Sequence, residues 1–167
     1  MCKPDDKKMS QDIVYHKTPI GIAKIVGNDK GIKSVSISDR EVEPTKDIPS
    51  SLKSCVVQLE EYFQKKRTTF DLKLDPEGTE FQNNVWKELL EIPYARTITY
   101  KEQSIKMGNE KAIRAIASAN GKNPIWLIIP CHRVIGADGS LTGYAGGIWR
   151  KKWLLEHENP TNQTSLF

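Results

Sequence analysis

Residues 123–134 read Asn-Pro-Ile-Trp-Leu-Ile-Ile-Pro-Cys-His-Arg-Val. The continuous apolar run at 125–129 predicts a strand that is buried on both faces. It leads directly into Pro-Cys-His-Arg at 130–133. Because a core segment that ends in polar residues often delivers them to a functional site, we expect the fold to hold Cys131 at the end of this strand.

Cys131 is a candidate nucleophile. A thiol of ordinary pKa, ~8.5, is only about 3% thiolate at neutral pH, whereas a pKa near ~6 would make it about 90% thiolate. His132 is a candidate base that takes the thiol proton directly or through a water. Such a histidine needs an orienting partner, and the helix predicted at 149–158 ends with two acids, Glu156 and Glu158, either of which could hold the imidazole.

Other readings of this segment are weaker. A lone Cys-His pair is often structural rather than catalytic. The glycines at 139–147 lack the Lys-Ser/Thr ending of a phosphate-binding loop, and we expect them to shape a turn around a flat ligand. A structural zinc needs four ligands with local pair spacing. The candidate ligands form no such pairs, so we expect no metal: they are Cys2, Cys55, Cys131, His16, His132 and His157.

Three helices are predicted before this segment. Thr79 to Gln82 has capping-box spacing and opens a helix that Pro93 ends, and Thr99 to Glu102 opens a shorter one that Gly108 stops. Asn109 is a candidate cap for an Ala-rich third helix that Gly121 ends. Two short helices joined by Gly-Asn favour a helix-turn-helix.

Basic residues concentrate in this part of the chain. The net charge is only +4, but residues 96–133 contain seven basic and two acidic residues, a surplus of five. This local surplus favours nucleic-acid binding. A helix rich in alanine also lets its backbone approach another surface closely, which suits a groove.

The first half of the chain predicts a separate α/β lobe. Three β-prone runs, 13–15, 20–26 and 32–37, are separated by turn residues and favour an antiparallel meander. Apolar residues at helical spacing predict a helix at about 51–64, with Cys55 on its buried face as a small core residue. The run 70–74 adds a further predicted strand.

Composition limits the classes of protein. The chain has 167 residues, 38% of them hydrophobic and 28% charged, which indicates a globular protein. No apolar run approaches the roughly 20 residues of a membrane span, and the first ten residues do not resemble a secretory signal. An odd number of cysteines does not favour a disulfide framework. We therefore expect a cytoplasmic protein, or a nuclear one in a eukaryote.

At these residues the sequence closely resembles the O6-alkylguanine-DNA alkyltransferases, also called methylated-DNA–protein-cysteine methyltransferases. The resemblance covers nearly all of residues 79–158, and only loosely the first lobe. Its motifs are Pro-Cys-His-Arg-Val at 130–134, the Asn-Pro hinge at 123–124, Tyr144, Gly146-Gly147, Leu154-Leu155, Glu158, Val85-Trp86, Ile92-Pro93-Tyr94, Tyr100 and Ala112 to Ala115.

The resemblance implies an α+β fold with a three-stranded antiparallel sheet in the N-terminal α/β lobe and a mainly helical, winged helix-turn-helix-like C-terminal lobe. We place these domains at 12–78 and 79–159, between flexible tails at 1–11 and 160–167. It also implies direct-reversal repair, in which the alkyl group of a flipped-out O6-alkylguanine moves irreversibly to the protein. O4-alkylthymine is a further candidate substrate. No cofactor is implied, and a monomer is expected.

Residue roles follow from matching positions. Cys131 resembles the nucleophile, His132 its base through a water, and Glu158 the residue that orients the imidazole. Tyr144 resembles the donor of a proton to guanine N3, and Asn123 ties the hinge to the site. The remaining matches bind the base, the phosphate or the minor groove of duplex DNA: Val134 and Ala145 at the base edge; Tyr100 at the target phosphate; Arg114 as the finger that fills the vacated stack; and Lys111, Ala112, Ala115 and Asn120 on the recognition helix.

Two departures from the family pattern affect helix packing. Ala95 stands where the family usually has Gly, and Ser118 replaces a common Gly. Relatives with Trp at the nucleophile position bind lesions without repairing them, whereas this sequence has Cys131. The main alternative is a winged-helix lesion sensor or regulator in which Cys131 is only a buried thiol. A thiol hydrolase is a third reading.

Overall fold

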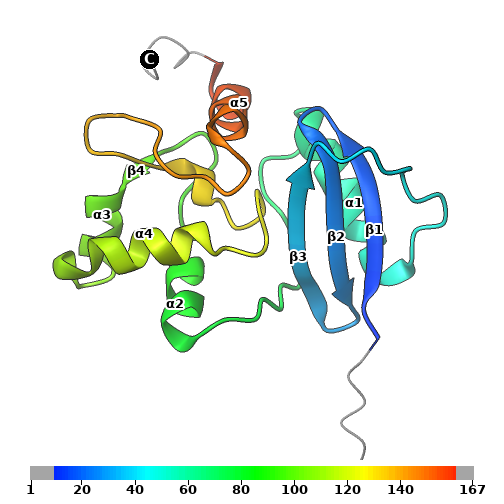
Figure 1. Cartoon of the computed structure of the whole chain (residues 1–167), viewed down its shortest axis with the longest axis horizontal. Helices are drawn as coiled ribbons and strands as arrows, with labels where there is room; N and C mark the ends of the chain where they lie inside the picture. The colour runs from blue at the N-terminus through cyan, green and yellow to red at the C-terminus, as the bar shows by residue number, and fades with distance from the viewer. Residues whose placement is uncertain (1–9, 161–167) are drawn as a thin grey trace, which may run out of the picture.

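The computed structural model describes residues 10–160, which form two lobes lying side by side (Figure 1). One lobe contains the three-stranded sheet and α1, and the other contains the remaining helices (Figure 1). The tails expected at 1–11 and 160–167 lie, apart from residues 10, 11 and 160, outside the described residues. Within the described part of the chain, no helix has the length and apolar character needed to cross a membrane.

The sheet confirms the predicted meander. Its strands pair antiparallel in chain order and are β1 (Asp12–Thr18), β2 (Gly21–Asn28) and β3 (Gly31–Ser38). The first turn is closed by Thr18 Oγ1, which donates to the carbonyl of Gly21 at 2.7 Å. In the second turn, Asn28 Oδ1 accepts from the backbone N–H of Lys30 at 2.9 Å, an Asx turn. Hydrogen bonds within the two turns therefore help to set the register of the three strands.

Helix α1 (Ser50–Phe63) packs against the sheet through one apolar face. Cys55 lies on that face at 1% exposure, and burial raises the pKa of its thiol to about 12. This side chain is therefore an inert core residue, as predicted. The other buried residues of the face are Leu52, Val56, Gln58, Leu59 and Tyr62.

The strand predicted at 70–74 does not form. Only Leu74 pairs with the sheet, in a single parallel bridge to Ile32. The side chain of Gln58 instead satisfies the backbone of Asp71, because its Oε1 accepts from the Asp71 N–H at 2.9 Å and its Nε2 donates to the carbonyl at 3.0 Å. A side-chain amide here replaces the neighbouring strand that a ladder would need.

The second lobe contains the predicted helices, and both predicted capping boxes are present. Thr79 accepts from the N–H of Gln82, and Thr99 accepts from the N–H of Glu102; each partner side chain also accepts from the backbone N–H of its threonine. The helices are α2 (Glu80–Leu89), α3 (Tyr100–Lys106), α4 (Ile113–Gly121) and α5 (Ile148–Glu158).

The connection between α3 and α4 differs from the prediction. Gly108 adopts φ +73°, the left-handed conformation that ends a helix. Asn109, however, makes no side-chain cap, so that prediction was wrong. A turn of 3-10 helix, η1 (Glu110–Ala112), precedes α4 instead, and the backbone N–H of Ala112 donates to the Asn109 carbonyl at 3.1 Å. This tight turn satisfies the backbone where a side-chain cap was expected.

Helix α4 is fixed against α2 by Trp86. The indole Nε1 donates to the carbonyl of Ala119 at 2.9 Å, and the ring leaves no space for a Cβ at Gly78. Gly78 therefore permits the chain to pass closely beneath the ring as it enters the second lobe.

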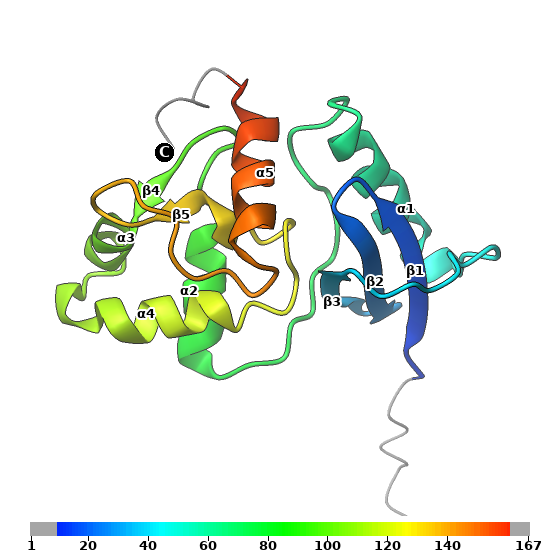
Figure 2. The same ribbon diagram turned by 45° about the horizontal axis from the view of Figure 1, so that its top comes forward.

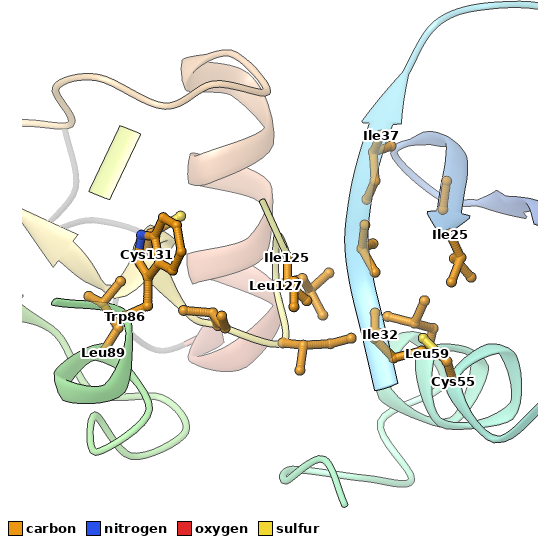
Figure 3. Close-up of a cluster of buried hydrophobic side chains, with 14 of the residues drawn as sticks. Ile25, Ile32, Ile37, Cys55, Leu59, Trp86, Leu89, Ile125, Leu127 and Cys131 are labelled. Carbon is orange, nitrogen blue, oxygen red and sulfur yellow. The ribbon is translucent and has the colours of Figure 1, made fainter. Parts of the chain in front are cut away.

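The apolar run 125–129 is buried, but it is not the predicted strand. Its start pairs with β3: Val35 donates to the carbonyl of Pro124, and Trp126 donates to the carbonyl of Val35, both at 2.9 Å. The chain then turns at Leu127, which has φ +74°. In Figure 3, Ile125 and Leu127 lie between the isoleucines of the sheet and the side chains of α2. The run is apolar throughout because both lobes pack against it. Its sequence therefore shows neither the period of a helix nor that of a strand.

The second lobe also contains a short pair of parallel strands, which the sequence analysis did not predict. Strand β4 (Ile98–Thr99) precedes α3 and pairs with β5 (Val134–Ile135). Because β5 directly follows the 3-10 turn η2 (Cys131–Arg133), this pairing holds that turn beside the start of α3 (Figure 2).

Candidate active site

Cys131 lies at the start of η2 with 8% of its surface exposed. The amide Nδ2 of Asn123 donates to Cys131 Sγ at 3.2 Å and to the carbonyl of Ile129 at 2.8 Å. Its Oδ1 accepts from the backbone N–H of Ile125 at 2.9 Å. One buried amide therefore fixes both the bend of the core segment and the sulfur at its end.

His132 is fully buried, and its Nε2 lies 2.7 Å from Glu158 Oε2. Of the two acids proposed as its partner, the structure thus selects Glu158 rather than Glu156. Since an ionised carboxylate only accepts, Nε2 carries the proton of the neutral ring. Nδ1 then keeps its lone pair, and it has no hydrogen-bond partner within the described residues.

Arg133 also binds Glu158 and does not face solvent. Its Nε donates to Glu158 Oε1 at 2.8 Å and its Nη2 donates to Oε2 at 3.1 Å, while Nη1 donates to the carbonyl of Ile92 at 2.8 Å. Arg133 was counted in the basic surplus of residues 96–133, and that assignment was wrong. Six basic residues against two acidic ones remain in the segment for a surface role.

Burial sets the protonation states of the site. It raises the pKa of the Cys131 thiol, although the Asn123 hydrogen bond and the Lys151 charge act in the opposite direction. It lowers the pKa of His132, so this ring is neutral near pH 7. Although burial opposes its charge, Glu158 has a pKa well below the ordinary value because His132 and Arg133 bind it. The resting site therefore holds a protonated thiol and a neutral imidazole, not the preformed thiolate considered from the sequence.

Lys151 is a residue of the site that the sequence analysis missed. It is buried in the first turn of α5, and its Nζ donates to the carbonyl of Thr142 at 3.1 Å and lies 5.8 Å from the centroid of the Tyr100 ring. Burial lowers its pKa to about 8, while the charge of Cys131 opposes that shift. No local pattern distinguishes this lysine from Lys152, the next residue of the same helix, which is half-buried.

Two tyrosines flank the sulfur. Tyr100 donates its hydroxyl proton to the carbonyl of Thr142 at 3.0 Å, and the ring of Tyr144 packs against Trp126 with centroids 5.8 Å apart. Burial raises the pKa of both phenols, so each stays protonated and can donate a hydrogen bond. Of the two residues predicted at the base edge, Val134 is buried and Ala145 is exposed.

Arg150, whose role the sequence analysis also did not predict, connects the loop before α5 to the first lobe. Its Nε donates to the carbonyl of Ile20 and its Nη1 to that of Gly146, both at 2.8 Å, and Nη2 lies 2.7 Å from Asp39 Oδ1. The backbone next to Tyr144 and Ala145 is therefore held by a guanidinium that reaches the sheet.

The comparisons with known proteins agree across both lobes. Residues 13–76 match the family model of the 6-O-methylguanine DNA methyltransferase ribonuclease-like domain, and residues 80–160 match that of the DNA-binding domain. The chain belongs to the 6-O-methylguanine DNA methyltransferase family. One relative is a methylated-DNA–protein-cysteine methyltransferase of Methanosarcina barkeri, which is 48% identical over 155 residues, covering 90% of this chain and 97% of the relative.

Solved structures of this family are similar in fold. The crystal structure of Mycobacterium tuberculosis O6-methylguanine methyltransferase has a TM-score of 0.81 and 42% sequence identity, covering 90% of this chain and 94% of that chain. A crystal structure of the M. tuberculosis protein in complex with DNA has a TM-score of 0.79 and 43% identity, covering 87% of this chain and 91% of that chain. These similarities confirm the predicted two-lobe α+β fold.

The residues of this chain that were predicted to bind DNA differ in exposure. Lys111, Arg114 and Ala115 are exposed, and Ala112 is half-buried. Asn120 is buried, and its amide exchanges two hydrogen bonds with Gln103 at 2.7 and 3.0 Å. Its side chain therefore connects α4 to α3, and this departs from the predicted DNA contact. Helical spacing explains the difference, because Asn120 shares the inner face of α4 with Ile116 and Ala119.

The described residues contain no group of three or more His, Cys, Asp or Glu side chains that could hold a metal ion. Cys2 lies outside the described residues. That no metal is needed stays a prediction.

Proposed function

We propose that this protein repairs O6-alkylguanine in DNA by direct reversal and transfers the alkyl group to Cys131. The observation that carries the proposal is a buried thiol followed in the chain by a neutral, buried imidazole. Glu158 binds Nε2 of this ring, and Nδ1 has no hydrogen-bond partner among residues 10–160. Membership in a family whose relatives are named methylated-DNA–protein-cysteine methyltransferases supports it.

In the proposed reaction, His132 Nδ1 takes the thiol proton of Cys131 through a water. Sγ attacks the alkyl carbon, so that a carbon–sulfur bond forms while the carbon–O6 bond breaks and its electron pair passes to the guanine. Tyr144 donates its hydroxyl proton toward N3 of the departing base, and the proton held by His132 replaces it. The carboxylate of Glu158 stabilises the transient imidazolium. The raised pKa of Cys131 is why a base is needed.

The flipped base is proposed to lie against backbone groups of Cys131, Val134 and Ala145, with the hinge at Asn123 keeping the sulfur in line. The exposure of Ala145 and the hydrogen bond from Arg150 to the carbonyl of the adjacent Gly146 favour this arrangement. A thioether has no ready leaving route in water. One protein molecule therefore repairs one lesion and is then spent.

On the DNA side, we propose that α4 enters the minor groove. Two small alanines, Ala112 at the end of η1 and Ala115 in α4, suit that narrow space. Contacts there carry little sequence information, which suits a protein that searches all DNA. Arg114 is proposed to fill the vacated stack and Tyr100 to rotate the target phosphate, while Lys111 adds charge beside them. Asn120 keeps α4 on α3 through Gln103.

Every group in this proposal comes from one chain, so we expect a monomer to be active without a cofactor. The decisive experiment incubates the whole protein with a duplex that contains O6-methylguanine and maps the modified peptide by mass spectrometry. We expect one methyl group on Cys131, none in Cys131→Ser, and full transfer in Cys55→Ser. Binding of the lesion without methylation would support the lesion-sensor alternative, and release of free alkyl product over many turnovers would support a hydrolase.

A further inference from the structure

The Glu158 carboxylate, which holds His132, receives a hydrogen bond from the other lobe. Tyr62, in the last turn of α1, is fully buried, and its hydroxyl donates to Glu158 Oε2 at 2.7 Å. The two residues are 96 positions apart in the sequence. We propose that Tyr62 is a positioning residue for alkyl transfer, which holds the Glu158 carboxylate that in turn holds His132. This inference rests on the proposed function.

The geometry at Glu158 gives Tyr62 a specific effect. Oε2 is the oxygen that binds His132 Nε2 at 2.7 Å, so the phenol and the imidazole share one acceptor atom. Arg133 binds both carboxylate oxygens from another direction. Because each donor withdraws charge from the carboxylate, the phenol limits the strength with which Glu158 holds a proton on His132.

The ring of Tyr62 has a separate, structural role. It packs against Phe63, Phe70, Tyr94 and His157, with ring centroids between 5.2 and 6.2 Å away. A phenylalanine would keep these contacts and lose only the hydroxyl. A tyrosine at this position is therefore explained by its bond to Glu158, since the buried hydroxyl would otherwise need a different partner.

Removal of the hydroxyl has a predictable direction. Without the Tyr62 hydroxyl, the Glu158 carboxylate carries more negative charge on the oxygen that faces His132. It then stabilises the protonated imidazole more strongly and raises the pKa of His132. A protonated imidazole cannot take the thiol proton, so the acidic limb of the pH–rate profile moves to higher pH. We expect Tyr62→Phe to slow single-turnover transfer by about tenfold on the acidic limb, where His132 is protonated, as for the loss of one hydrogen bond to a charged group. The loss should be smaller near neutral pH. The rates should converge at alkaline pH.

The experiment uses the full chain and free O6-benzylguanine, which needs no DNA binding, over a range of pH. Tyr94→Phe is the matched control, because it removes a hydroxyl from the same aromatic cluster while Tyr94 makes no hydrogen bond to Glu158 within the described residues. Alkylation of Cys131 by iodoacetamide over the same pH range gives a readout that does not depend on alkylguanine. Both measurements should show the acidic limb shifted in Tyr62→Phe and unchanged in Tyr94→Phe.

A double-mutant cycle with Glu158→Gln tests whether Tyr62 acts through the carboxylate. If it does, removing the hydroxyl in the Glu158→Gln background has no further effect on the rate. Equal pH profiles for Tyr62→Phe and wild type, or additive losses in the cycle, would overturn the proposal. Failure of the wild type to methylate Cys131 would instead overturn the proposed function.

Should Tyr62→Phe not fold, a ring-fluorinated tyrosine at position 62 provides a second test. Its more acidic hydroxyl is a stronger donor, which lowers the pKa of His132 and moves the acidic limb to lower pH. A shift in the other direction, or no shift, would contradict the proposed role of the hydroxyl.

Discussion

The Nδ2 of Asn123 lies 3.2 Å from Cys131 Sγ, and this bond connects the residue before the Pro124 hinge to the proposed nucleophile. The same amide donates to the carbonyl of Ile129 and accepts from the N–H of Ile125. Asn123 Oδ1 therefore holds the backbone, and Nδ2 donates to both the backbone and the sulfur. Substitutions that change the amide differently can test how its bond to the sulfur affects transfer.

Asn123→Asp should slow alkyl transfer more than Asn123→Ala does. Aspartate keeps the acceptor for Ile125 but replaces the donor to Cys131 with a negative charge, which raises the pKa of the thiol further. Both variants should lose about 2 kcal/mol or more of stability, because each leaves the Ile129 carbonyl without its donor. Alanine also leaves the Ile125 N–H unpaired, and aspartate buries a carboxylate. Single-turnover rates of both variants test the predicted ranking of rates, with thermal unfolding to verify that each variant is folded.

Asn28→Asp is the matched control, because Asn28 is also a buried asparagine whose Oδ1 accepts from a backbone N–H, in a turn of the first lobe. It should leave the transfer rate unchanged. A faster transfer in Asn123→Asp than in Asn123→Ala would contradict the proposed effect of a negative charge beside the sulfur.

Lys151→Met should lower the transfer rate only below about pH 8, the pKa to which burial lowers this lysine. Below that pH the wild-type ammonium favours the Cys131 thiolate; above it the wild type loses the charge as well, so the two rates should converge. We expect a loss of roughly tenfold near neutral pH, equivalent to one pKa unit on the thiol. Lys87→Met, an exposed site on α2, is the control. A constant ratio of rates across pH 6 to 10, as approximate limits, would contradict an electrostatic role.

Local features of the fold could be predicted from the sequence, and long-range features could not. The boxes at Thr79 and Thr99 involve residues three positions apart, so their spacing is sufficient. Arg133 was instead placed on the basic surface, because its partner Glu158 is 25 positions away and only the fold brings them together. The role of Lys151 and the bond from Tyr62 to Glu158 were missed for the same reason.

The candidate site could be predicted where its residues form a continuous motif or keep a fixed spacing in the sequence. The motif at 130–134 and the spacing to Tyr144 and Glu158 gave the resemblance. The protonation states did not follow from it, because they depend on the burial of Cys131 and His132 in the folded protein. The turn at Leu127 was hidden in a run whose residues are all apolar.

Ala95→Gly should stabilise the protein. Ala95 has φ +62°, a left-handed conformation that costs a residue with a Cβ about 1–2 kcal/mol and costs glycine little. This position is also one where the family usually has Gly. A gain of about 1 kcal/mol should raise the melting temperature by roughly 2–4 °C. Ala137→Gly, at an exposed loop alanine without a positive φ, should give no gain. A lower melting temperature in Ala95→Gly would show that the left-handed backbone is not strained.

Arg114→Ala should slow repair in duplex DNA far more than transfer from free O6-benzylguanine. Arg114 is exposed in the first turn of α4, so its two candidate roles are a phosphate contact and the finger that fills the gap left by a flipped base. A free base needs no extrusion, and the cost of unstacking is then absent. Lys122→Ala, an exposed basic residue at the other end of α4, is the matched control for loss of charge.

The strength of pairing opposite the lesion distinguishes the two roles. If Arg114 replaces the extruded base, a stable pair should worsen the defect of Arg114→Ala, and a mismatch or an abasic partner should relieve it. Loss of a phosphate contact should instead change the salt dependence and show no dependence on pairing strength, as expected for Lys122→Ala. Single-turnover rates on free base, mismatched duplex and paired duplex decide between them. Equal fold losses on all three substrates would rule out the finger, because a residue that fills the vacated stack cannot affect a base that was never stacked.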